Sequence, residues 1–151
     1  MTGKPYYVEA EWTRGREGTV QAESVKELAF SAPPEFGGKD GLWTPEHLLL
    51  AAVTTCYIAT FSAIAEHNKF GFRGLRVSAE AALEKVPGGM RFATITLRPR
   101  LTIDDPEKRD QALLLVEKAK KACIISRSLA TEILMDAAIA CCDSQHVPEL
   151  V

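Results

Sequence analysis

The longest run of hydrophobic positions lies between residues 43 and 69, WTPEHLLLAAVTTCYIATFSAIAEHNK, and predicts a central helix. Its start carries several helix signals. Thr44 can cap the first turn, Pro45 fits the first helical position, and Glu46 places negative charge near the positive end of the helix dipole. Gly71, just past the apolar run, is the expected stop.

The apolar residues of this stretch surround nearly the whole helix instead of forming one stripe, and no charged residue interrupts them between Glu46 and Glu66. Such a helix needs neighbours on most sides, so we expect a core helix enclosed by sheet. Its length would also suit a membrane span. We expect no membrane insertion, because the ends are polar and threonines stand inside at positions 54, 55 and 60.

A period of two replaces the helical pattern between residues 75 and 103, where apolar and polar residues alternate on both sides of the segment Pro87–Gly89. The alternation predicts a long antiparallel hairpin with one buried face. Pro99 has no N–H for a strand ladder, so we expect the second strand either to bulge there or to lie at an edge.

Short runs of β-forming residues also fill positions 6–31. They predict a strand, a turn around 15–18, a second strand, and a third strand near 28–30. The Pro- and Gly-rich segment 31–41 predicts a surface loop.

The C-terminal part of the chain predicts a second helix after Asp105, which can cap it. Cys123 follows the end of this amphipathic helix, whose apolar positions are Ala112, Leu115, Val116 and Ala119. The stretch 127–142, for which Ser126 is a candidate cap, fits either a short helix followed by a strand or one longer helix. Together the elements predict an α+β fold in a single domain spanning residues 1–151.

Composition narrows the class of protein. The 151 residues are 46% hydrophobic and 25% charged, with a formal net charge of −2. These values are typical of one globular domain, and the absence of a broad basic footprint argues against nucleic acid as a partner. The first residues contain no apolar signal segment, so we expect a cytoplasmic protein in which cysteines are mostly free thiols.

Metal binding is not indicated, because His47, His67 and His146 have no ligand spacing to the cysteines. No glycine-rich phosphate loop follows a strand, and no G-x-S-x-G element of a serine hydrolase occurs. The adjacent Cys141 and Cys142 are best explained as small residues near the end of a strand.

Cys56 and Cys123 are the remaining candidates for chemistry. A cysteine in an apolar helix is usually an inert packing residue. A reactive cysteine must instead be a thiolate near neutral pH, and an arginine held by a carboxylate is one arrangement that keeps positive charge beside sulfur. Arg16, in a glycine turn, and Glu46, at the start of the helix, are candidates for that pair.

Three segments resemble the OsmC/Ohr family of organic hydroperoxide reductases. TPEHLLLAAVTTC resembles the family signature N-P-E-x-L-x-A-x(5)-C, and GREG at 15–18 is similar to the G-R-D-G turn that carries the family's arginine. KACIISRSL is similar to the C-P-x-S-x-A element that carries its second cysteine, with Ile124 in place of the usual proline. Two arginines, Arg14 and Arg16, flank the turn, and the GREG match favours Arg16.

The resemblance implies a thiol peroxidase without flavin, haem or metal. Cys56 would be the peroxidatic thiolate and Cys123 the resolving cysteine. Arg16 would stabilise the thiolate and the peroxide oxygen, and Glu46 would orient Arg16. An external dithiol, which in that family can be a lipoylated protein, would reduce the resulting disulfide.

A second subunit is expected from helix geometry. On one straight helix Glu46 and Cys56 are separated by roughly 15 Å and about 80° of rotation, too far for one short arginine bridge. Either the same chain folds Arg16 and Glu46 in from elsewhere, or a second subunit supplies them. We therefore expect an intertwined homodimer, with antiparallel sheets wrapped around long central helices, in which a second copy completes the site.

Two other functions remain open from the sequence. One is a catalytically inactive protein of the same fold that binds a lipid-like or acyl ligand. The other is general thiol–disulfide exchange, for which the usual C-x-x-C motif is missing.

Overall fold

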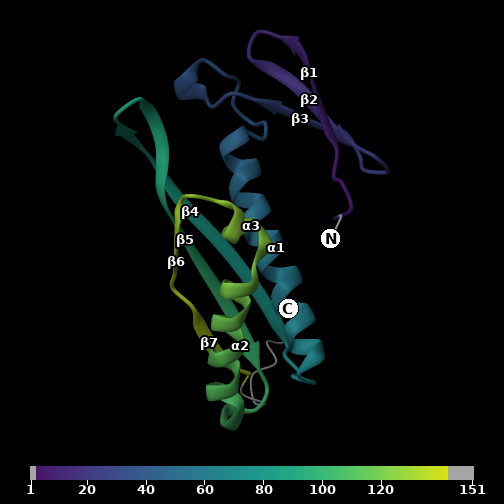
Figure 1. Ribbon diagram of the computed structural model, residues 1–151, viewed down its shortest axis with the longest axis vertical. Coiled ribbons are helices and arrows are strands. Elements are labelled where there is room, and N and C mark those ends of the chain that lie inside the picture. The colour runs from purple at the N-terminus through teal and green to yellow at the C-terminus, as the bar shows by residue number, and fades with distance from the viewer. Residues whose placement is uncertain (1–2, 143–151) are drawn as a thin grey trace, which may run out of the picture. The chain divides into compact units, whose positions relative to one another are not determined.

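The computed structural model describes residues 3–142 and has the α+β composition that the sequence predicts (Figure 1). Its contacts divide the chain into two compact units, residues 1–49 and 50–151. His146 lies outside the described residues. The expectation of a single domain stays a prediction.

The first unit contains an antiparallel sheet in the order β1-β2-β3, with β1 at Val8–Arg14, β2 at Glu17–Ala22 and β3 at Leu28–Ser31. These are the strands predicted from the sequence. A short 3-10 helix, η1, at Pro34–Phe36 lies within the predicted loop. Gly18 is required in β2, because a Cβ there would lie 2.5 Å from the Glu11 carbonyl oxygen and 2.7 Å from the Phe30 ring.

The central helix α1 spans Pro45–His67. Its predicted cap is confirmed, because Thr44 Oγ1 accepts the His47 N–H at 3.2 Å while the Thr44 N–H donates to His47 Nδ1 at 3.3 Å. The predicted stop at Gly71 is wrong. Lys69 adopts the left-handed conformation, with φ of 51°, and ends the helix earlier.

The second unit contains a sheet built on the predicted hairpin. Strand β4, Gly74–Val86, pairs antiparallel with β5, Gly89–Ile103, and the chain turns at Pro87 and Gly88. Two short strands, β6 at Glu132–Met135 and β7 at Ala138–Cys141, pair with β5 in parallel. They run parallel because a helical connection returns the chain to the same end of the sheet.

Pro99 lies in the middle of this sheet, so the expectation of an edge or a bulge there is wrong. It stands opposite Val77 of β4 with no register shift at that pair. The Leu97 carbonyl accepts the Asp136 N–H at 2.9 Å, so the backbone nitrogen of Pro99, two residues later, faces the same side of β5. At this level β6 has ended and β7 has not begun, so the missing N–H removes no ladder bond.

The connection between β5 and β6 contains η2 at Pro106–Lys108, α2 at Arg109–Ala122 and α3 at Ile124–Ser128. Asp105 caps this segment by accepting the Glu107 N–H at 2.9 Å. The sequence after Cys123 leaves open a short helix followed by a strand or one longer helix. The structure has the short helix α3, which is followed by the strands β6 and β7. Ser126 lies inside α3 and does not cap it.

The core of the second unit lies between the sheet and two helices, α1 and α2, that cover the same face of it (Figure 1). The predicted apolar positions of α2 are all buried. They meet a stripe on α1 and the inner face of β5. This core consists of Val53, Tyr57, Phe61, Ala65, Phe70, Ile95, Leu97, Leu101, Ile103, Ala112, Leu115, Val116, Ala119 and Ile139.

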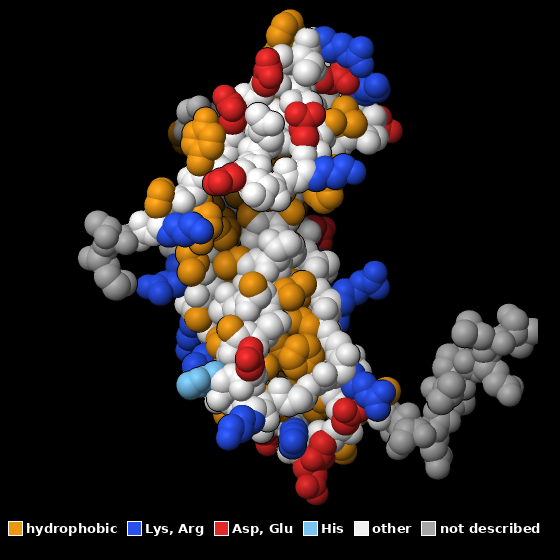
Figure 2. Space-filling view, turned by 90° about the vertical axis from the view of Figure 1, so that its right-hand side faces the viewer, with side chains coloured by type: hydrophobic (Ala, Val, Ile, Leu, Met, Phe, Trp, Pro, Cys, Tyr) orange, Lys and Arg blue, Asp and Glu red, His pale blue; other side chains and the backbone are white. Residues whose placement is uncertain are grey.

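The opposite side of α1 is apolar and exposed. Thr55, Ile58, Ala59 and Ala63 are all exposed there, and the next charged residue is Glu66. Figure 2 shows hydrophobic side chains along this face and charged side chains at its margins. By length and composition α1 could cross a membrane, and 22% of its most apolar window is buried. The buried stripe against α2 and the sheet is nevertheless the packing of a core helix.

Candidate functional site

Cys56 lies in the middle of α1 beside the buried stripe and is half-buried. Its sulfur lies 3.9 Å from Thr60 Oγ1, one helical turn further on. Residues four positions apart share one face of a helix, so the sequence pattern itself brings this hydroxyl to the sulfur. Cys56 therefore presents its thiol beside a polar group on an otherwise apolar helix.

Cys123 occupies the junction between α2 and α3 and is fully buried. Its N–H still donates to the Ala119 carbonyl at 3.0 Å, but its backbone is extended, with φ of −60° and ψ of 112°. This change of direction ends α2 and starts α3. As a result, the Cys123 side chain and the amides of Ile124 and Ile125 face the sulfur of Cys56.

The pKa of Cys56 reflects this environment. Burial alone raises the pKa of a thiol. Hydrogen bonds from the Ile125 amide, the Cys123 side chain, the Thr60 hydroxyl and the Ile124 amide together outweigh burial, so the pKa of Cys56 is lowered from its ordinary value. Donors around the sulfur stabilise the thiolate, which is the reactive form.

The two cysteines singled out from the sequence are thus neighbours, and both are free thiols. Cys141 and Cys142 are also free. Cys141 ends β7, as expected for a small residue at a strand end, and Cys142 is exposed. The arrangement of Cys56 and Cys123 permits one sulfur to take part in chemistry begun at the other.

Tyr57 fixes the helix that carries Cys56. Its ring is fully buried, and its hydroxyl donates to the Val116 carbonyl of α2 at 3.0 Å. Burial raises the pKa of this phenol, and the nearby Glu117 and Cys123 raise it further, so Tyr57 is a neutral donor. The bond links α1 to the helix that ends at Cys123.

The two candidate arginines lie in the first unit and have different partners. Arg14 pairs with Glu17 at 3.1 Å, and Lys39 lies 3.9 Å from the same carboxylate. The Arg16 guanidinium donates to the Phe36 carbonyl. Within the described residues no ion pair joins Arg16 to Glu46. The assignment of Arg16 to the thiolate and of Glu46 to Arg16 stays a prediction.

Glu46 lies in the first turn of α1. Its Oε2 is buried, and among residues 3–142 it has no hydrogen-bond partner. A buried carboxylate oxygen without a donor is costly, so such groups are usually satisfied by a partner. Glu46 therefore has the capacity to accept a cationic donor.

The sequence does not assign a site role to three groups beside Cys56, the Thr60 hydroxyl and the amides of Ile124 and Ile125. Thr60 could have been found there, because it lies four positions after Cys56. The amides of Ile124 and Ile125 could not have been found from the sequence, because their direction depends on the turn at Cys123.

In the described part of the chain no group of three His, Cys, Asp or Glu residues could hold a metal ion.

Comparison with known proteins places this geometry in a family. A family model described as OsmC-like protein matches residues 38–138, a span that includes both cysteines. The chain belongs to the OsmC family. Among curated proteins, the uncharacterized protein YmaD of Bacillus subtilis is 28% identical over 134 residues, which cover 85% of this chain and 89% of that protein. A protein named peroxiredoxin OsmC, from Escherichia coli, is 28% identical over 132 residues, with the same shares covered.

Solved structures share the OsmC fold. An OsmC-like protein of unknown function from Vibrio cholerae superposes with a TM-score of 0.82 at 19% identity, covering 90% of this chain and all of that one. An OsmC described as an organic hydroperoxide resistance protein, from Legionella pneumophila, gives 0.75 at 22% identity, covering 93% and 99%. These likenesses confirm the predicted fold class.

Proposed function

We propose that this OsmC-family protein is a cysteine-based peroxidase that reduces organic hydroperoxides to alcohols, an antioxidant role in the stress response. One observation carries the proposal. Cys56, a half-buried thiol of lowered pKa, lies beside a second free thiol, Cys123. The names of the E. coli and L. pneumophila relatives support the same chemistry.

The first step uses the thiolate of Cys56. It attacks the distal oxygen of a hydroperoxide ROOH, an S–O bond forms, the O–O bond breaks, and the alkoxide leaves as the alcohol after protonation. The amides of Ile124 and Ile125 and the Thr60 hydroxyl hold the thiolate before attack. Arg16, held by Glu46, would stabilise the charge that develops on the peroxide oxygens.

The second step uses Cys123. Its thiolate attacks the sulfenic sulfur of Cys56, so that a disulfide forms and hydroxide leaves and becomes water. An external dithiol, for example on a lipoylated protein, then reduces the Cys56–Cys123 disulfide and is itself oxidised. The chain needs no flavin, haem or metal in this cycle.

Substrate choice follows from the apolar surroundings of the thiol. Ile124 and Ile125 both present apolar side chains next to the amides that face Cys56, and Ile124 is 72% exposed. Burying an alkyl group gains about 0.8 kcal/mol per methylene. We therefore expect organic hydroperoxides to be preferred over hydrogen peroxide.

The test compares peroxide consumption by four proteins in the presence of dithiothreitol and cumene hydroperoxide. The wild type should turn over, Cys56→Ser should be inactive, and Cys123→Ser should lose the ability to form an intramolecular disulfide. Cys141→Ser is the matched control and should retain full activity. Absence of turnover in the wild type would reject the proposal and favour a binding protein of the same fold.

A further inference from the structure

A side-chain hydroxyl contacts the sulfur of Cys123. Ser126 Oγ donates a hydrogen bond to Cys123 Sγ at 3.3 Å, across the first turn of α3. Cys123 is fully buried, whereas Ser126 is half-buried. A buried anion is costly unless it accepts hydrogen bonds. Ser126 is therefore placed to supply one when this sulfur carries negative charge.

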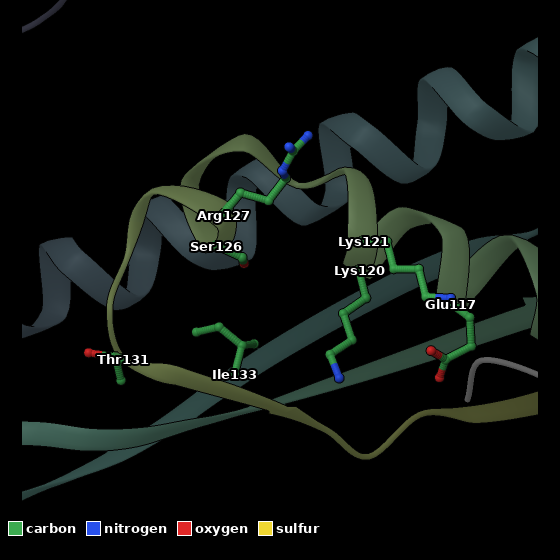
Figure 3. A pocket seen from close by; sticks show the side chains of 7 residues that line it. All are labelled: Glu117, Lys120, Lys121, Ser126, Arg127, Thr131 and Ile133. Carbon is green, nitrogen blue, oxygen red and sulfur yellow. The ribbon is translucent and has the colours of Figure 1, made fainter.

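Ser126 also borders a surface pocket of about 250 Å³ beside α2, α3 and β6. In Figure 3 the Ser126 side chain points from α3 toward the pocket, Lys120 extends into it from α2, and the Arg127 guanidinium points away. Among the described residues Lys120 and Lys121, which both line the pocket, take part in no ion pair. The hydroxyl thus lies between the buried sulfur and a solvent-accessible recess whose charged lining includes Lys120, Lys121 and Glu117.

We propose that Ser126 is a further catalytic residue of this protein, which donates its hydrogen bond to the Cys123 thiolate while that thiolate closes the disulfide with Cys56. The inference rests on the proposed peroxidase function and assigns a residue to its second step.

The Cys123 thiolate donates an electron pair to the sulfenic sulfur of Cys56, the S–S bond forms, the S–O bond breaks, and hydroxide leaves and is protonated to water. The Cys123 sulfur is oxidised and the Cys56 sulfur is reduced to the disulfide level. The proton of the Ser126 hydroxyl stays on its oxygen, because the residue acts as a donor and not as a base.

Helix α3 provides a matched control for this role. Ser128 lies in the same short helix, but its hydroxyl donates to the Ile124 carbonyl at 2.8 Å and is exposed. Ser128→Ala therefore removes a hydroxyl from α3 without touching the bond to Cys123. Ser126→Thr keeps a hydroxyl at the position of interest and tests whether the hydroxyl itself is needed.

The experiment follows a single turnover of the reduced full-length protein after one equivalent of cumene hydroperoxide. Samples are quenched rapidly with N-ethylmaleimide, and mass spectrometry identifies the thiols that remain. Loss of the Cys56 thiol reports the sulfenic acid, and loss of the Cys123 thiol reports the disulfide. We expect Ser126→Ala to form the sulfenic acid at the wild-type rate but to close the disulfide about tenfold more slowly. Dimedone should then trap more sulfenic acid than in the wild type.

Ser126→Thr should restore closure, and Ser128→Ala should behave as wild type. Closure at the wild-type rate in Ser126→Ala would overturn the inference. So would an equal loss in Ser128→Ala, or an equal slowing of both steps, since either would indicate a general effect on α3.

A second oxidant separates this inference from the proposed function. Diamide is a diazene that converts two thiols to a disulfide while it is reduced to the hydrazine, so it closes the Cys56–Cys123 pair without a peroxide. If the wild type does not react with cumene hydroperoxide, the peroxidase proposal fails. Slower closure of Ser126→Ala with diamide would still support the role of the hydroxyl, and unchanged closure would reject it.

Discussion

The Tyr57 hydroxyl donates to the Val116 carbonyl, and this bond joins the helix that carries Cys56 to the helix that ends at Cys123. Tyr57 is the immediate neighbour of Cys56 in the chain, and its side chain belongs to the buried stripe of α1. The relative position of the two thiols therefore depends on a buried polar contact as well as on the packing of apolar side chains.

Tyr57→Phe should lower the free energy of unfolding by about 1 kcal/mol, because it removes one buried hydrogen bond and preserves the ring. It should also slow disulfide closure, since α2 is held less firmly against α1. Urea unfolding and single-turnover thiol loss measure the two effects. The control is Tyr6→Phe, at a residue that is 94% exposed, and it should change neither quantity. Equal stability of the two variants would contradict the structural role of the bond.

Tyr57 should also make the free energy of unfolding fall at alkaline pH. The folded state raises the pKa of Tyr57, first through burial and then through Glu117 and Cys123, above the value of about 10 expected in the unfolded chain. The stabilisation is therefore fully present below about pH 10 and is lost as the pH rises further. The free energy of unfolding should fall with pH above this point in the wild type and less steeply in Tyr57→Phe. Parallel curves would show that Tyr57 is not the responsible group.

Replacing Ile124 by the proline usual in the family should raise the pKa of Cys56. Proline fits the first position of α3, and Cys123 before it is already extended, so the backbone can accept the change. However, the substitution removes the Ile124 N–H, one of the donors that lower the pKa of Cys56. The pH dependence of iodoacetamide alkylation, measured in a Cys123→Ser, Cys141→Ser, Cys142→Ser background, reports this pKa.

Ile124→Ala is the control for that experiment, because it shortens the side chain and keeps the N–H. It should leave the alkylation midpoint where it is, while Ile124→Pro moves it to higher pH. If both variants move the midpoint equally, the side chain and not the amide controls the thiol.

Local sequence signals predicted most of the fold, and the errors arose where a distant segment decides the structure. The cap at Thr44 and the alternation of the β4–β5 hairpin depend on neighbours in the chain, so the sequence was sufficient. The sequence does not predict the central position of Pro99, because the gap between β6 and β7 that accommodates it is formed by residues more than thirty positions later. Propensity favours Gly71 as the helix stop, yet Lys69 adopts the left-handed conformation first.

The candidate site was predicted less completely than the fold. Residue types singled out Cys56 and Cys123, and the family resemblance paired them. The sequence contains no signal for the amides that face Cys56, and it offers Ser126 only as a helix cap and as the serine of the C-P-x-S-x-A element, not as a hydrogen-bond donor to Cys123. These groups come from one turn, at Cys123, whose direction is set by packing of α2 and α3. The role of Arg16 depends on a partner that is distant in sequence, so it stays a prediction.

The two arginines at the glycine turn can be separated by mutation. Arg14 is paired with Glu17, whereas the Arg16 side chain forms no ion pair among the described residues and donates to the Phe36 carbonyl. If Arg16 stabilises the peroxide oxygens, Arg16→Met should lower kcat/KM for cumene hydroperoxide by about a hundredfold, as expected for loss of one charged donor to a developing anion. Arg14→Met should have a much smaller effect. The reverse order would assign the role to Arg14.

The exposed apolar face of α1 should be covered by a second copy of the chain. Ile58 belongs to the exposed face of α1 that also contains Thr55, Ala59 and Ala63 and carries no charge before Glu66, and burying a face of this kind is a common basis of symmetric dimers. Light scattering should give the wild type about twice the monomer mass of 16.5 kDa. Ile58→Glu should shift the measured mass toward that of the monomer. Peroxidase activity should fall in parallel, because we expect the partner copy to supply Arg16 and Glu46 across the interface that this variant disrupts. Leu114→Glu, at a residue of α2 that is 71% exposed, is the control and should remain dimeric and active. A wild-type protein with the monomer mass and full activity would exclude a shared site and leave one copy to complete it alone.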